Sequence, residues 1–187
     1  QLRTQLLQNY NKETRPVINL NNSVNMKIGI QIRNIEYFDQ VSETIGLNMW
    51  ITQQWYDQYL TWNTSQYDIN YINMNSDEIW LPDLELYNAA SKPKVYNMNN
   101  NIILYHDGKI EWTIPAIFSF LCPLSLQKFP YDSQICNMEY GSWKFSKDSL
   151  DIRPFDNSDS HSSFSISPDF SHNEWIINKF SGQHNEY

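Results

Sequence analysis

The two cysteines of this chain, Cys122 and Cys136, are spaced to form one disulfide bond around residues 123–135. The chain has no CxxC pair, so this spacing favours a bridge in an oxidising compartment over a metal site. Closing a loop of about 15 residues stabilises a fold by about 3 kcal/mol in the chain-entropy model. The alternative is two unpaired buried thiols.

Three aromatic residues fall where side chains are presented rather than packed. Trp50 stands between Asn48 and Thr52 on the polar side of an alternating stretch, and Tyr87 and Trp143 lie at expected strand ends. An indole on the solvent face of a strand is unfavourable unless a partner or a ligand covers it. Electron-rich ring faces bind organic cations, and a desolvated quaternary ammonium gains about 2 kcal/mol or more. The set predicts an organic-cation site; the alternative is that each ring packs on its own neighbours.

Other chemistry lacks a matching pattern in the sequence. The four histidines are scattered, none at ligand spacing to a cysteine, so we expect no zinc and no other metal. There is no nucleophile elbow, no P-loop and no paired carboxylates, so we expect neither an enzyme nor a cofactor. Asp83 and Asp132 follow proline-containing turns, where we expect them to accept hydrogen bonds from the backbone.

Composition limits the class of protein. A length of 187 residues fits one domain, 1–187, and 41% hydrophobic residues suffice for a core. A formal net charge of −8 argues against nucleic acid as a partner. No stretch of about 18 apolar residues predicts a membrane helix, and Gln1 does not begin a signal peptide. Sequons at Asn21 and Asn63 are compatible with glycosylation and an extracellular location.

The elements that must position these residues are mostly strands. Leu2, Leu6, Leu7 and Tyr10 recur at helical spacing, which predicts a helix that stops before Arg15-Pro16. The period then changes to two, which is typical of half-buried strands. The alternating apolar positions are Val24 to Ile32, Leu47 to Ile51, Ile110 to Ile114, Cys136 to Tyr140, and Leu150 to Ile152.

This pattern predicts an all-β fold, an antiparallel immunoglobulin-like β-sandwich with an N-terminal α-helix. If Ile110, Trp112 and Ile114 face the core, then Glu111 and Thr113 face outward, as Trp50 does. Residues 156–171 carry no clear period and read as a long, mobile surface loop.

The chain resembles the extracellular ligand-binding domain of nicotinic acetylcholine receptor subunits and the soluble acetylcholine-binding proteins that share its fold. The likeness covers nearly the whole chain, and its most specific part is the Cys-loop with its internal Phe129-Pro130. Tyr131 stands where the family usually has a second phenylalanine. The other matching stretches are Asn9-Tyr10-Asn11, Arg15-Pro16-Val17, Trp50 to Trp55, Asp57, Leu60-Thr61-Trp62-Asn63, Trp80-Leu81-Pro82-Asp83, Leu86-Tyr87-Asn88, Asp107-Gly108-Lys109-Ile110 and Gly141-Ser142-Trp143.

The resemblance implies a ring pentamer, homomeric or heteromeric, that binds acetylcholine or a related cationic agonist between neighbouring subunits. Binding would be coupled to a cation channel through the Cys-loop. The principal face would carry Tyr87, Trp143 and, from a C-terminal hairpin, Tyr187. The complementary face would carry Trp50, Thr52, Ile103, Tyr105, Glu111 and Thr113.

The resemblance also implies a last strand, an adjacent cysteine pair in agonist-binding subunits, and four membrane helices, all beyond Tyr187. A receptor domain on the extracellular, postsynaptic side of the plasma membrane is therefore the leading hypothesis. A soluble secreted acetylcholine-binding protein, a non-binding structural subunit and a sugar-binding β-sandwich are the alternatives.

Overall fold

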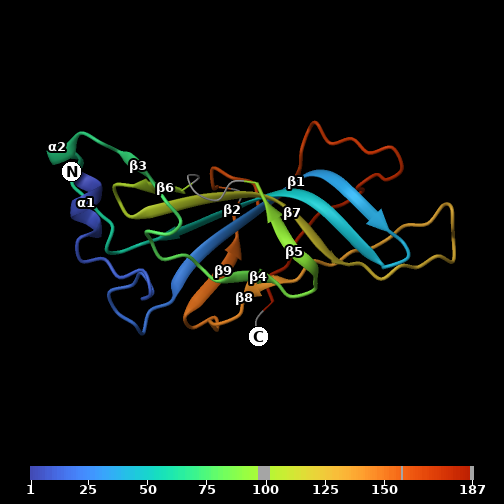
Figure 1. The fold of residues 1–187 in the computed structure, drawn as a ribbon, viewed down its shortest axis with the longest axis horizontal. Coiled ribbons are helices and arrows are strands. Elements are labelled where there is room, and N and C mark those ends of the chain that lie inside the picture. Colours follow the sequence, from blue (N-terminus) through green and yellow to red (C-terminus); the bar gives the residue numbers. More distant parts are fainter. Residues whose placement is uncertain (97–101, 157, 186–187) are drawn as a thin grey trace.

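The chain folds as an all-β sandwich with a short N-terminal helix, which confirms the predicted fold class (Figure 1). The structure is a computed structural model that describes residues 1–96, 102–156 and 158–185. Its two helices are α1 (Leu2–Leu7) and α2 (Thr64–Tyr67). Its strands are β1 (Val24–Asp39), β2 (Thr44–Tyr56), β3 (Tyr71–Met74), β4 (Leu84–Leu86), β5 (Ala89–Val95), β6 (Ile102–Tyr105), β7 (Lys109–Leu121), β8 (Tyr140–Ser142), β9 (Leu150–Pro154) and β10 (Phe164–Ile166).

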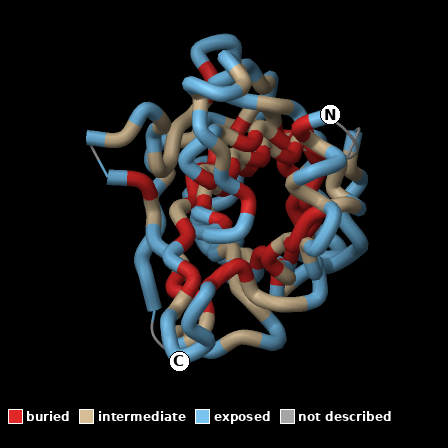
Figure 2. The backbone as a smooth tube through the Cα atoms, turned by 90° about the vertical axis from the view of Figure 1, so that its left-hand side faces the viewer, coloured by how far each residue is buried: buried red, intermediate tan, exposed pale blue. Residues whose placement is uncertain are grey.

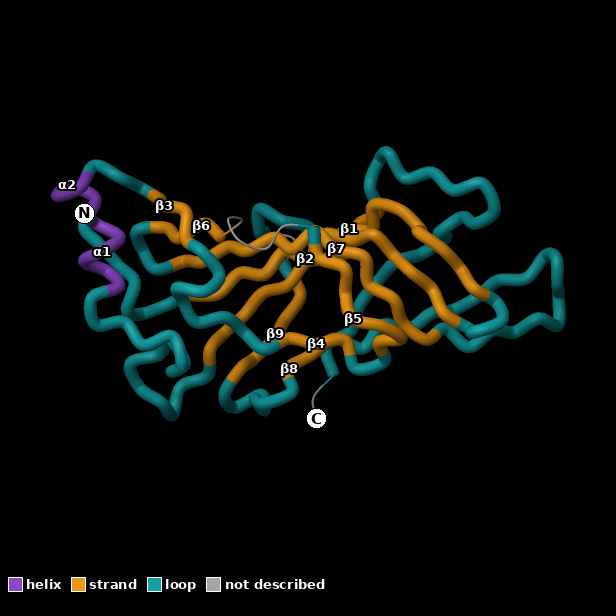
Figure 3. The backbone as a smooth tube through the Cα atoms, in the orientation of Figure 1, coloured by secondary structure: helices purple, strands orange, loops and turns teal. Residues whose placement is uncertain are grey.

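The main sheet is built on three long strands. Within the described residues its order is β10-β1-β2-β7-β6-β3, with β5 added on β7 and β9 added on β1, while β4 and β8 form a separate pair (Figure 3). The expectation of a purely antiparallel sandwich needs one refinement, because β1 pairs in parallel with β9 and β10. Both short strands reach the free edge of β1 through long connections, which parallel pairing requires.

The core lies on one face of this sheet and follows the predicted alternation. Val24, Met26, Ile28, Ile30 and Ile32 are all buried. Leu47, Met49 and Ile51 on β2 lie beside them on the same face of the sheet, and so do Ile110, Trp112 and Ile114 on β7. Buried segments therefore line the interior when the molecule is viewed along its long axis (Figure 2).

The first helix is shorter than predicted. Helix α1 ends at Leu7, well before Arg15-Pro16. Asn11 accepts a hydrogen bond from the Glu13 backbone N–H at 3.0 Å, a local bond that competes with helix continuation. Tyr10 lies beyond the helix and contributes to the core instead.

Two later segments of the chain, around β8 and β10, also differ from expectation. Strand β8 covers Tyr140–Ser142, so only Tyr140 of the alternating stretch Cys136 to Tyr140 lies in a strand, although burial still alternates through Cys136 and Met138. The stretch 156–171, which carries no clear period and was predicted to be a surface loop, contains β10. Its backbone bonds to β1, with the Ile30 N–H donating to Ser163 at 2.8 Å. Three residues are too few to show a period.

Cys122 and Cys136 form the predicted disulfide, with Cα atoms 4.8 Å apart. The loop they close contains a cis peptide bond before Pro130 and extends from the end of the molecule opposite α1 (Figure 1). Within it, Asp132 accepts a hydrogen bond from the Gln134 side chain rather than the expected backbone bond.

Candidate ligand-binding site

One face of the main sheet gathers the residues predicted for the complementary side. Thr52 on β2 lies opposite Thr113 on β7, with hydroxyl oxygens 3.1 Å apart. Ile103 on β6 lies opposite Glu111 on β7. Side chains two residues apart on a strand share a face. The register therefore gives one surface to Trp50, Thr52, Ile103, Tyr105, Glu111 and Thr113.

Trp50 points away from the core, as predicted, with 44% of its surface exposed. Its ring is not bare, because the Arg33 guanidinium carbon lies 4.8 Å from the ring centroid. Tyr105 has a similar neighbour, the Lys109 ammonium nitrogen at 4.1 Å. Both aromatic rings of the predicted set therefore contact a cation of their own chain.

Negative charge also reaches this face. Partial burial raises the pKa of Tyr105, and the nearby carboxylate of Glu111 raises it further. The Glu111 carboxylate lies 3.0 Å from Nε2 of His161. The surface therefore combines aromatic rings with groups of both charges.

The second cluster, Tyr87 and Trp143, stands on the β4–β8 pair. Tyr87 follows β4 and Trp143 follows β8, at opposite ends of this antiparallel pair, and the Tyr87 ring reaches back over Gly141 to Trp143. Their ring centroids lie 5.3 Å apart, and 74% of Trp143 is exposed. A Cβ on Gly141 would meet the Tyr87 hydroxyl at 2.9 Å, so the glycine permits this close approach.

Polar contacts fix the backbone on both sides of Trp143. The Tyr87 hydroxyl donates to the Ser142 carbonyl. Asp83 accepts from the Ser142 hydroxyl at 2.6 Å and from the Lys144 N–H at 2.8 Å. Asp83 thus binds backbone as expected, but in the loop that carries Trp143 rather than in its own turn.

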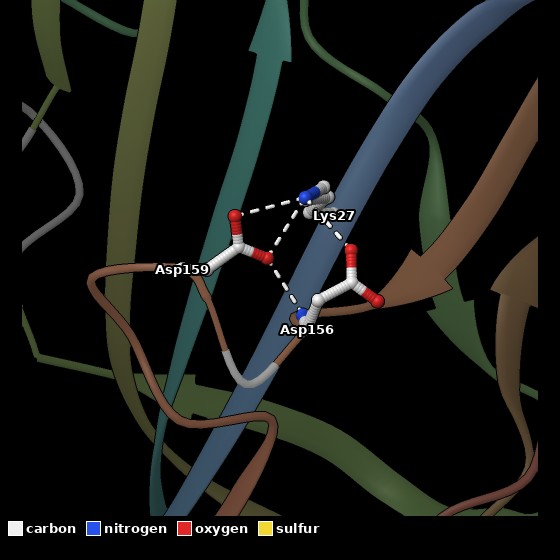
Figure 4. Close-up of polar contacts among 3 residues, drawn as sticks. All are labelled: Lys27, Asp156 and Asp159. Atoms are coloured by element: carbon white, nitrogen blue, oxygen red, sulfur yellow. Dashed lines mark hydrogen bonds and ion pairs between the residues drawn. The ribbon is translucent and has the colours of Figure 1, made fainter.

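A segment that we call the strap, residues 155–156 and 158–163, covers the outer face of β1. Lys27 donates to Asp156 at 3.1 Å and to both oxygens of Asp159 at 2.8 Å (Figure 4). These bonds raise the pKa of Lys27 and lower that of Asp159. The strap therefore docks through charge.

The strap also packs closely. A Cβ on Gly29 would lie 2.6 Å from the Ser162 carbonyl oxygen and 2.8 Å from the Phe155 ring, so only glycine permits this contact. Phe155 is buried, and its ring centroid lies 5.3 Å from that of His161. His161 in turn contacts Glu111, so the strap reaches the complementary cluster.

Comparison with known proteins identifies the family of this chain. The family model described as "Neurotransmitter-gated ion-channel ligand binding domain" matches residues 1–187. This chain belongs to that family. Among its relatives is the neuronal acetylcholine receptor subunit alpha-9-II of Oncorhynchus mykiss, 36% identical over 81% of this chain and 28% of the relative. Another is the neuronal acetylcholine receptor subunit alpha-4 of Mustela putorius furo, 35% identical over 79% of this chain and 24% of the relative. A third is the acetylcholine receptor subunit alpha-L1 of Schistocerca gregaria, 34% identical over 79% of this chain and 27% of the relative.

The chain thus spans about a quarter of the length of these relatives. A neurotransmitter-gated ion-channel ligand-binding domain is a receptor domain rather than an enzyme. The disulfide between Cys122 and Cys136 is consistent with the Cys-loop of this family. In the described part of the chain, no helix is long and apolar enough to cross a membrane.

All of the predicted ligand-binding and glycosylation residues stay predictions. Tyr187 lies outside the described residues. Asn21 and Asn63 are exposed, as glycosylation requires, and the Asn63 side chain also caps α2 by accepting from the Ser65 N–H at 2.9 Å.

Sequence reasoning missed the residues that support the site. Asp83 was recognised only as a turn residue, and Lys27 looks like any outward position of a strand. Arg33 follows a run of regular alternation, and nothing in that run signals the local irregularity that turns it toward Trp50. The strap could have been predicted only from charge, because Asp156 and Asp159 are acidic and β1 carries a single lysine, Lys27, with which they pair.

Proposed function

We propose that this domain binds acetylcholine or a similar organic cation in an aromatic cage between neighbouring subunits of a pentamer. Tyr87 and Trp143 of one subunit form the principal face. Trp50, with its neighbours on β2, β7 and β6, forms the complementary face of the next. In the full-length protein, on the extracellular side of the plasma membrane, binding opens a cation channel.

The observation that carries this proposal is the Tyr87–Trp143 pair. Two rings 5.3 Å apart, one of them 74% exposed, leave apolar surface that favours a covering guest. Asp83 binds the residues on both sides of Trp143, and the Tyr87 hydroxyl donates to the Ser142 carbonyl, so the rings are positioned before any ligand arrives. A quaternary ammonium over such rings needs no formal counter-charge.

A guest held by two subunits explains why the clusters stand on different sheets. The principal pair rises from β4 and β8, whereas the complementary residues lie on the main sheet. The relatives named as acetylcholine receptor subunits supply the ligand class.

The test replaces Trp143 by alanine in the full-length protein and measures acetylcholine affinity by displacement of a radiolabelled nicotinic ligand. Losing a desolvated cation–π contact of about 2 kcal/mol lowers affinity about 30-fold. Trp143→Phe should retain part of it, because a ring face remains. Ile18→Ala, which alters a side chain of similar exposure (71%), should change nothing.

Unchanged affinity in Trp143→Ala would refute the cage. An assembled wild-type pentamer that binds no acetylcholine would instead favour the non-binding structural subunit.

A further inference from the structure

On the complementary face, the positively charged Arg33 side chain already lies over the Trp50 ring that the proposed cage would offer to a ligand. We infer that Arg33 is a specificity-determining residue of the site, whose guanidinium occupies the Trp50 ring and must be displaced by an organic cation. The inference rests on the proposed function and adds that the Arg33 guanidinium competes with the bound cation for the Trp50 ring. Its first observation is the 4.8 Å separation between the Arg33 guanidinium carbon and the Trp50 ring centroid.

A bulge in β1 places Arg33 at this ring. Ile32 pairs with Met49 and Asn34 pairs with Asn48, so β1 advances two residues where β2 advances one. Arg33 is the extra residue, without a register partner on β2. A bulge bends its strand and re-aims the side chain of the extra residue. Trp50 follows Met49 directly, so the re-aimed side chain lies next to the indole.

The bulge is accommodated without disturbing the core. Ile32 is buried before it and Ile35 after it, an odd spacing that regular alternation would not allow. Ile35 pairs with Leu47, which is buried as well. The irregularity therefore changes only the outward position, where Arg33 lies.

Arg33 is weakly held by other groups, so a guest can displace it. An ion-pair partner is Asp169, at 4.0 Å and with 87% of its side chain exposed. Such an exposed pair contributes little. The planar guanidinium, by contrast, stacks well on an aromatic face. The ring is thus a principal contact of Arg33, and the charge remains near the ring after displacement.

This arrangement predicts that the affinity for cations is held down by Arg33. A guest ammonium must replace an existing cation–π contact and then sit beside a like charge, which raises the free energy of the bound state. An uncharged guest of the same shape must also displace the guanidinium, at least in part, from the Trp50 ring. It is not repelled by the displaced positive charge. The effect therefore depends on the charge of the guest.

The test measures choline and its uncharged carbon isostere, 3,3-dimethylbutan-1-ol, as displacers of a radiolabelled nicotinic ligand on the full-length protein. Arg33→Gln should bind choline about fivefold more tightly, the equivalent of one exposed cation–π contact, with a smaller change for the isostere. Arg33→Lys, which keeps the charge, should stay near wild type. Lys92→Gln removes an exposed cation on β5 and should leave both affinities unchanged.

A second variant leaves the bulge intact. Asp169→Asn removes the exposed counter-charge of Arg33 and should weaken choline binding, because the net positive charge at the ring increases. Tighter choline binding in Asp169→Asn, or equal gains for choline and its isostere in Arg33→Gln, would overturn the inference.

The two proposals fail separately. If Arg33→Gln leaves choline affinity unchanged while Trp143→Ala abolishes binding, the cage stands and Arg33 has no part in it. If Trp143→Ala also binds normally, the cage itself is wrong.

Discussion

Tyr10 links the N-terminal segment to the core through a buried hydroxyl. It donates to Asp57 at 2.6 Å and accepts from the Trp80 N–H at 3.0 Å. Burial raises the pKa of Tyr10 above its ordinary value, and the negative charge of Asp57 adds to this. Burial raises the pKa of Asp57 too, although its hydrogen bonds from Tyr10 and the Tyr59 N–H act in the opposite direction.

Tyr10→Phe should therefore destabilise the domain by about 1–3 kcal/mol, because the buried Asp57 carboxylate loses one of its hydrogen bonds and the Trp80 N–H loses its acceptor. Denaturant unfolding measures the change. Tyr67→Phe is the matched control, since its hydroxyl donates to Gln5 at the surface and should cost under about 0.5 kcal/mol. Equal effects of the two substitutions would contradict the account.

At the scale of single residues, the sequence predicted which face of a strand a side chain occupies better than it predicted which residues that side chain contacts. The alternation around Met49 and Ile51 placed Trp50 outward because a period of two leaves no other choice. It could not reveal Arg33 over that ring, since a bulge is set by pairing between strands and leaves no period of its own. Asp83 illustrates the same limit, because its partner Ser142 is distant in the sequence.

At the scale of elements, the strap shows how charge holds an irregular segment. Asp159 accepts hydrogen bonds from Lys27 and from the Asp156 N–H, the latter at 2.6 Å, and both lower its pKa. A carboxylate whose pKa falls on folding stabilises above the unfolded value of about 3.9, and this is lost as pH drops through the lowered pKa. Lys27, with a raised pKa, contributes fully below its unfolded value of about 10.4, and this contribution is lost as pH rises through the raised pKa.

Lys27→Met should consequently raise the pKa of Asp159 toward its ordinary value. The ¹⁵N chemical shift of the Asp156 amide, titrated from pH 6 downward, reports this ionisation directly. Asp39 is the control, because hydrogen bonds from Ser42 and Val41 lower its pKa without any lysine. An Asp159 midpoint that stays in place, or an Asp39 midpoint that shifts with it, would disprove the lysine as cause.

The sequence predicted an element correctly where its alternation of apolar and polar residues is long, and failed where the element is short. Strands β1, β2 and β7 carry enough alternating residues to be recognised, and they form the centre of the sheet. Helix α1 was predicted too long because Leu7 and Tyr10 continue its spacing while the backbone already turns. Strand β10 has three residues and forms only because β1 offers it a free edge.

At the scale of the whole molecule, the disulfide joins the two parts of the sandwich. Cys122 follows β7 of the main sheet, and Cys136 precedes β8 of the small one. Residue spacing left open whether the thiols pair, and resemblance to the family implied that they do. Neither could show that the bridge lies between the layers that carry the two halves of the candidate site, since that depends on the packing of the sheets.

Cys136→Ser should lower the free energy of unfolding by about 3 kcal/mol, because the unfolded chain regains the entropy of an open loop of about 15 residues. Denaturant unfolding with and without a thiol reductant supplies the control. Reductant should destabilise the wild-type domain by a similar amount and leave Cys136→Ser unchanged, since that variant has no bridge to break. A variant as stable as the wild type, or one that reductant weakens further, would mean that the two layers are held together by their side-chain packing and not by this bond.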